Sequence, residues 1–103
     1  MSVSTHVLDA GRGRPAAAVS VRLERRTDLG WQPVAGGSTD ADGRIARLGA
    51  TAGTGPHRLI FDTAAHSPFY PEVVITFEVA DPAEHYHVPL LLSPFAYSTY
   101  RGS

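Results

Sequence analysis

Residues 72–80, Glu-Val-Val-Ile-Thr-Phe-Glu-Val-Ala, form the longest apolar alternation in this chain. An extended backbone points successive side chains to opposite faces, so every second residue shares a face. One face of this stretch therefore collects Val73, Ile75, Phe77 and Val79. The spacing predicts a β-strand with one buried side.

The same reasoning extends outward to the rest of the chain. Residues 17–25 place Val19, Val21 and Leu23 on an inward face. Short apolar stretches recur elsewhere between turn residues, which include most of the 10 Gly and 8 Pro, and no stretch has a convincing helical period. The predicted strands are 3–9, 17–25, 31–34, 44–48, 57–62, 72–80, 85–92 and 97–101.

Turns are expected at 11–15 and at 40–43, and the Gly pair 36–37 is expected to break the strand before it. Residues 63–71 are expected to hold at most one helical turn. Short connections without a long crossover helix predict an all-β fold, an antiparallel sandwich of two packed sheets with about eight strands. At 103 residues the chain is expected to form one domain, residues 1–103.

Composition excludes several classes of function. The chain has no Cys, which removes disulfides, thiolate metal sites and a cysteine nucleophile. All 9 basic residues are Arg, so no lysine amine is available for a Schiff base or a P-loop. The net charge of −1 indicates neither nucleic acid nor an anionic membrane as a partner. Neither a membrane span nor a secretory signal is visible, so the cytoplasm is the expected location.

Three features exceed the needs of a plain sandwich. His6 lies within a predicted strand, His85 and His87 share a face of another, and residues 97–103 end the chain with two tyrosines and an arginine. Each also has a structural interpretation. A strand histidine is most often a surface or hydrogen-bonded residue, as expected for His57 and His66.

Other structural interpretations concern the arginines, the tail and metals. Arg44 could cap a surface, Arg101 could be a solvated chain end, and the aromatic tail could pair with another subunit. His-x-His can bind zinc, but a third ligand at fixed spacing is missing. Serine-hydrolase, dinucleotide-binding, calcium-loop and paired-carboxylate patterns are also incomplete or absent.

Several segments, taken in order, resemble the transthyretin-related family across essentially the whole chain. The terminal Tyr-Arg-Gly-Ser, residues 100–103, is similar to the signature of the 5-hydroxyisourate hydrolases within that family. Residues 63–68 are shorter than the matching family segment, which usually contains a short helix. The resembling segments are 4–9, 13–16, 40–44, 69–73, 85–94 and 97–103.

This resemblance implies a transthyretin-like fold, a homotetramer, and active sites in a channel between dimers. The implied reaction opens 5-hydroxyisourate to 2-oxo-4-hydroxy-4-carboxy-5-ureidoimidazoline in urate (purine) degradation. The implied catalytic residues are His6, Arg44 and His87. These three are also expected to bind substrate, together with Tyr100, Arg101, Gly102 and Ser103.

The chemistry of these groups fits the implied reaction. An imidazole with a pKa near 6.5 can deprotonate water at neutral pH, and a second one can protonate a leaving nitrogen. A guanidinium can grip a planar anionic substrate and stabilise a developing oxyanion. Either His6 or His87 could be the base, and no metal or organic cofactor is required.

Two other functions remain open at this stage. A transthyretin-like carrier would hold a small ligand without catalysis, although acid–base groups would then serve no purpose. An accessory β-sandwich of a larger secreted protein would leave the C-terminal motif unexplained.

Overall fold

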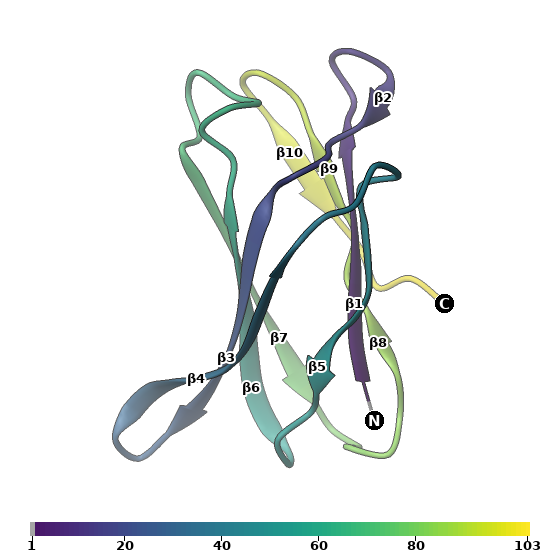
Figure 1. Ribbon diagram of the computed structural model, residues 1–103. Helices are drawn as coiled ribbons and strands as arrows, with labels where there is room; N and C mark the ends of the chain where they lie inside the picture. The colour runs from purple at the N-terminus through teal and green to yellow at the C-terminus, as the bar shows by residue number, and fades with distance from the viewer. Residues whose placement is uncertain (1) are drawn as a thin grey trace.

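The computed structural model describes residues 2–103, which form two β-sheets (Figure 1). One sheet has the order β10-β9-β1-β2, with β5 and β8 also paired to β1, and the other has the order β4-β3-β6-β7. The predicted two-sheet sandwich is therefore confirmed. The strands are β1 (Ser2–Asp9), β2 (Arg14–Pro15), β3 (Ser20–Thr27), β4 (Gly30–Ser38), β5 (Arg44–Ala50), β6 (Gly55–Asp62), β7 (Glu72–Val79), β8 (Tyr86–His87), β9 (Leu90–Leu92) and β10 (Tyr97–Thr99).

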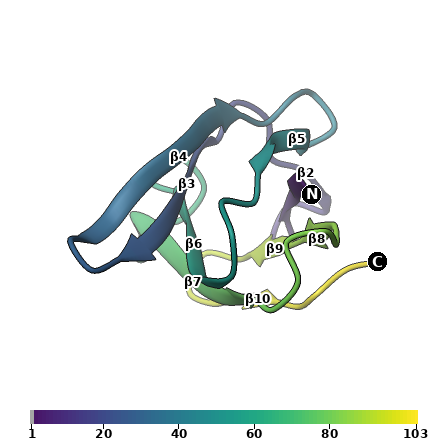
Figure 2. The ribbon, with the colours of Figure 1, turned by 90° about the horizontal axis from the view of Figure 1, so that it is seen from below.

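The core lies between the two sheets, which face each other in the end-on view (Figure 2). The alternation predicted for β3 and β7 is confirmed, because Val21, Leu23, Val73 and Val79 are buried there. Burying one such side chain contributes about 1.5–3 kcal/mol. From the opposite sheet, β1 and β9 contribute Val3, Val7, Leu90 and Leu92.

The expected break at Gly36 and Gly37 is wrong, because β4 continues to Ser38. Both glycines remain in the ladder with β3. A Cβ on Gly37 would lie 3.6 Å from a Leu48 methyl group and 3.8 Å from one of Ile45. The glycines therefore continue the strand, and a side chain at Gly37 would make only ordinary contact with β5.

The predicted strand 85–92 divides into β8 and β9 at Val88 and Pro89. Proline has no N–H for a ladder bond, so the strand is interrupted there. Both pieces run parallel to β1, with Ser4 opposite His87 and Val7 opposite Leu90. This sheet therefore contains parallel as well as antiparallel pairs, although antiparallel pairs predominate in the fold.

Smaller differences occur at element ends. The expected turn at 11–15 contains β2, which pairs with the end of β1, and β3 begins only after Ala18, whose φ is +59°. The last predicted strand, 97–101, ends at Thr99. Residues 2–103 contain no helix, and the expected helical turn is limited to N–H bonds from His66 and Ser67 to the carbonyl of Thr63. No helix that could cross a membrane occurs in this described part.

Candidate active site on the outward face of β1

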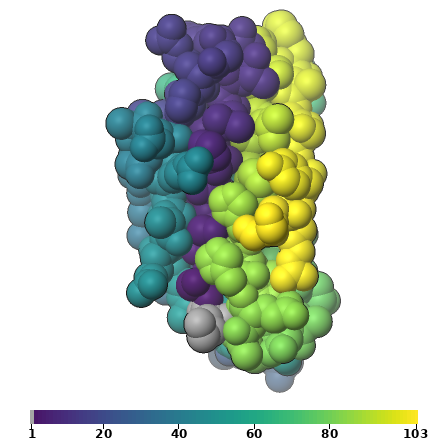
Figure 3. All heavy atoms as spheres, turned by 90° about the vertical axis from the view of Figure 1, so that its right-hand side faces the viewer, coloured from purple at the N-terminus to yellow at the C-terminus, as the bar shows by residue number. Residues whose placement is uncertain are grey.

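Strand β1 brings the three predicted catalytic residues together. It pairs with β5 on one side, where His6 lies opposite Arg44, and with β8 on the other, where Ser4 lies opposite His87. Cross-strand partners point to the same face, and so do residues two apart on one strand. Figure 3 shows this face, with β1 in purple between the teal β5 and the green and yellow C-terminal strands.

The turn at 40–44 positions Arg44. One carboxylate oxygen of Asp40 accepts the backbone N–H groups of Asp42 at 2.9 Å and Arg44 at 3.0 Å. Gly43 has a φ of +76°, and a Cβ there would overlap the carbonyl oxygen of Val7. Only glycine combines that conformation with that approach, so the turn docks directly on β1.

The same turn fixes the protonation pattern of His6. Its Nε2 lies 2.9 Å from the carbonyl oxygen of Asp42. A carbonyl only accepts hydrogen bonds, so Nε2 carries a proton in the neutral ring and Nδ1 holds the lone pair. Nδ1 is therefore the ring nitrogen of His6 that is open to accept a hydrogen bond or a proton.

His87 is held by a serine on β1. Its Nδ1 lies 2.7 Å from Ser4 Oγ, which leaves Nε2 as the nitrogen available to a ligand. Burial lowers the pKa of His87, and the charges of His6, His85 and Arg44 lower it further. His87 is therefore neutral at neutral pH, as a general base must be.

The C-terminal tail packs against His87. The Gly102 N–H donates to the His87 carbonyl at 2.8 Å. A Cβ on Gly102 would overlap His87 Cδ2 and lie 3.2 Å from Cγ. Glycine is therefore required here by the imidazole ring rather than by backbone conformation.

A hollow of about 280 Å³ opens beside His87. The ladder between β1 and β5 is interrupted there, because Val3 pairs with Gly49 while Thr5 pairs with Ile45. The extra residues of β5 bend this strand away from β1 opposite Ser4. The hollow is lined by Ser4, Thr5, Arg44, Ala46, His87 and Ser103.

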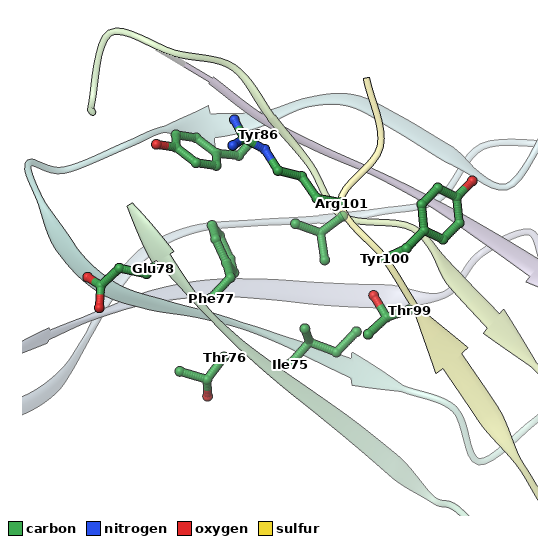
Figure 4. Close-up of a pocket in the computed structure, with 9 residues that line it drawn as sticks. Ile75, Thr76, Phe77, Glu78, Tyr86, Thr99, Tyr100 and Arg101 are labelled. Carbon is green, nitrogen blue, oxygen red and sulfur yellow. The ribbon is translucent and has the colours of Figure 1, made fainter. Parts of the chain in front are cut away.

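Two of the predicted substrate-binding side chains lie elsewhere in the single chain. Arg101 donates to the Glu84 carboxylate at 3.0 Å, and its guanidinium lies 4.6 Å from the centre of the Tyr86 ring. Tyr100 is exposed and points away from Tyr86 (Figure 4). Both line a different hollow, of about 330 Å³, between β7 and the tail. Only Gly102 and Ser103 of the tail therefore approach His87 within one chain.

Sequence reasoning missed Ser4 and Thr5. Ser4 lies two positions before His6 on one strand, so the alternation that placed His6 outward also indicated Ser4. Thr5 is fully buried, and its hydroxyl donates to the Val88 carbonyl at 2.7 Å. That contact holds β8 against β1, and local periodicity could not have found it.

His57 and His66 lie outside this site. His57 is fully buried, with Nδ1 3.0 Å from the carbonyl of Gly55. His66 Nδ1 lies 3.4 Å from the Asp9 carboxylate. Among residues 2–103, no three His, Asp or Glu side chains are grouped so as to hold a metal ion.

The fold and the site define a transthyretin-like β-sandwich with two imidazoles and a guanidinium on the outward face of one sheet. The chain belongs to the HIUase/Transthyretin family, whose model matches residues 3–102.

Relatives and solved structures agree with this assignment. The chain is 45% identical to a 5-hydroxyisourate hydrolase of Salmonella typhimurium, over 98% of this chain and 80% of the relative. Identity to a 5-hydroxyisourate hydrolase of Caulobacter vibrioides is 46%, over 98% and 97%. The Klebsiella pneumoniae 5-hydroxyisourate hydrolase structure matches with a TM-score of 0.84 at 34% identity, covering 100% of both chains. Sea bream transthyretin in complex with thyroxine matches with a TM-score of 0.86 at 35% identity, covering 99% of this chain and 95% of that chain.

Proposed function

We propose that this protein is an enzyme that hydrolyses 5-hydroxyisourate in urate degradation. The observation that carries the proposal is the meeting of His6, Arg44 and His87 on one face, from three separate strands. The curated relatives named hydrolases at 45% and 46% identity support the same activity. A carrier has no use for two imidazoles with defined hydrogen-bond partners beside an arginine.

The reaction divides among these residues. Neutral His87 accepts a proton from water as the water oxygen bonds to the ring carbonyl carbon of the substrate. Arg44 holds the planar substrate and stabilises the negative charge that develops on the carbonyl oxygen. The bond from carbon to the ring nitrogen then breaks, and protonated His6 gives its Nδ1 proton to that nitrogen. No step in this sequence needs a cofactor.

We also propose that the working form is a homotetramer. The hollow at His87 is open in the single chain, and hydrolytic sites gain from walls that exclude bulk water. Large apolar side chains are exposed on and near β10, and they are Phe69, Phe95, Tyr97 and Tyr100. A second subunit would cover such side chains and could bring Tyr100 or Arg101 to a neighbouring site. The cysteine-free composition fits the cytoplasm, which we propose as the location.

The direct test follows the ultraviolet decay of freshly made 5-hydroxyisourate with and without the protein. The wild type should accelerate the decay, whereas a carrier would change only the spectrum of the bound ligand. His87→Ala should reduce kcat at least about a hundredfold, the scale of lost acid–base catalysis. His66→Ala is the matched control, because it removes a histidine outside the site. Near-normal turnover in His87→Ala, or a monomeric mass by light scattering in the active preparation, would contradict the corresponding proposal.

A further inference from the structure

A continuous chain of hydrogen bonds runs along the outer edge of the site. Ser2 Oγ lies 2.7 Å from His85 Nδ1, and His85 Nε2 lies 2.8 Å from Ser4 Oγ. Ser4 Oγ in turn lies 2.7 Å from His87 Nδ1. The chain therefore links His87 to His85, which is exposed to solvent.

The parallel pairing of β1 and β8 builds this chain. Val3 lies opposite Tyr86, and Ser4 lies opposite His87. Residues on either side of Val3 and Tyr86 therefore form two adjacent rows on the outward face. One row contains the serines of β1, and the other contains His85 and His87.

The hydrogen bonds of this chain can run from donor to acceptor in either of two opposite directions. A hydroxyl has one proton to donate and lone pairs that accept, and a neutral imidazole has one donor and one acceptor nitrogen. In one direction His87 Nδ1–H donates to Ser4, Ser4 donates to His85, and His85 donates to Ser2. In the other direction every donor becomes an acceptor, and Ser4 donates to His87 Nδ1. The first direction leaves a lone pair on His87 Nε2, and the second leaves a proton there.

We propose that Ser4 and His85 are positioning residues that couple the protonation of His87 to solvent through this chain. The inference rests on the proposed hydrolase function. When His87 Nε2 takes a proton from water, the Nδ1 proton passes to Ser4 Oγ, and the Ser4 proton passes to His85 Nε2. The His85 Nδ1 proton passes to Ser2, and the Ser2 proton passes to solvent. One proton enters and one leaves, so the charge of the chain is unchanged.

Charge near His87 supports this role. Burial and the charges of His6, His85 and Arg44 all oppose a net positive charge on the His87 ring. A ring that takes a proton while releasing another avoids that charge.

The test compares Ser4→Ala with Ser4→Thr, which keeps the hydroxyl, and with Ser20→Ala, an exposed serine on β3. Nitrogen-15 NMR of the full-length protein reports the ratio of the two neutral tautomers of His87. In the wild type and Ser4→Thr, replacing His85 by Ala should change this ratio. In Ser4→Ala the same replacement should leave the ratio unchanged. A ratio in the wild type that is indifferent to His85 would overturn the proposal.

Kinetics supply the second readout. Ser4→Ala should lower kcat about tenfold or more, with KM changed less than about twofold, since Ser4 acts on a proton transfer and not on substrate affinity. Ser4→Thr should restore most of kcat. Unchanged kcat in Ser4→Ala, or no rescue by Thr, would overturn the proposal. Absence of hydrolysis by the wild type would refute the proposed function alone, because the NMR result is independent of turnover.

Discussion

Gly102→Ala would test the geometry of the site with a single methyl group. The added Cβ would overlap His87 Cδ2 and lie 3.2 Å from Cγ. No positive φ is involved at this position, so the change adds volume without backbone strain. The added methyl group can be accommodated only if the imidazole of His87 moves or the tail lifts from β8.

The size of the displacement follows from van der Waals distances. Carbon atoms in ordinary contact lie about 3.5–4.0 Å apart, so the ring or the tail must shift by roughly 1 Å. A misplacement of about 1 Å in a catalytic group can cost about a hundredfold in rate. The effect should appear mainly in kcat, because the proposed mechanism has His87 act on the attacking water. Stability should change by less than about 1 kcal/mol, since the Gly102 N–H makes one hydrogen bond to this strand.

The assay follows 5-hydroxyisourate decay in Gly102→Ala and in a matched glycine variant. Gly36→Ala is the control, because a Cβ there would meet only the Val21 carbonyl oxygen at 3.6 Å. This control lies on β4, in the sheet opposite the site. Wild-type kcat in Gly102→Ala would show that the ring of His87 need not occupy its observed position, and the assigned mechanism would fail.

Three further predictions concern the turn, the pH profile and the core. Gly43→Ala should cost at least about 1–2 kcal/mol in chemical unfolding, because the side chain meets a positive φ and the carbonyl of Val7; an unchanged midpoint would refute the assigned need for glycine. Since the pKa of His87 lies below its usual 6.5, kcat/KM should hold as pH falls through 6.5 and decline only below the lowered pKa. A decline in kcat/KM centred above about pH 6.5 would contradict this assignment. The same pKa shift means that the folded state binds fewer protons than the unfolded chain, so the free energy of unfolding should decrease as the pH falls below about 6.5. Thr39→Val should cost about 1–3 kcal/mol by thermal unfolding with kcat unchanged, because the buried Thr39 hydroxyl accepts the N–H of Val19 at 2.9 Å; an equal loss of kcat would count against its purely structural role.

Local periodicity predicted which side chains are buried, but not which strands are neighbours. Val73 and Val79 lie on the buried face as their spacing indicated. The parallel pairing of β8 with β1 could not follow from alternation, because a period of two assigns a face and not a partner. The glycine pair at 36–37 was wrongly expected to break its strand for a related reason. Both glycines pair with Val21 and Arg22 of the neighbouring β3, which local composition could not indicate.

The part of the candidate site that lies in family motifs was predictable from the sequence. The resemblance named His6, Arg44 and His87, and the strand register brings them to one face. The direction of Arg101 was not predictable, because the tail leaves the strand after Thr99 and its guanidinium follows Glu84 and Tyr86. Whether Arg101 serves substrate stays a prediction that depends on assembly.

The pairing of β1 with β8 has a kinetic consequence. Ser4 and His87 are 83 positions apart in the chain but share one hydrogen bond. The antiparallel pairs β3–β4 and β6–β7 involve much shorter separations and can form early, whereas contacts between remote segments form slowly. Circular dichroism would therefore recover before turnover does during refolding. Recovery of enzymatic activity would therefore report a late folding step, the pairing of the C-terminal β8 with the N-terminal β1.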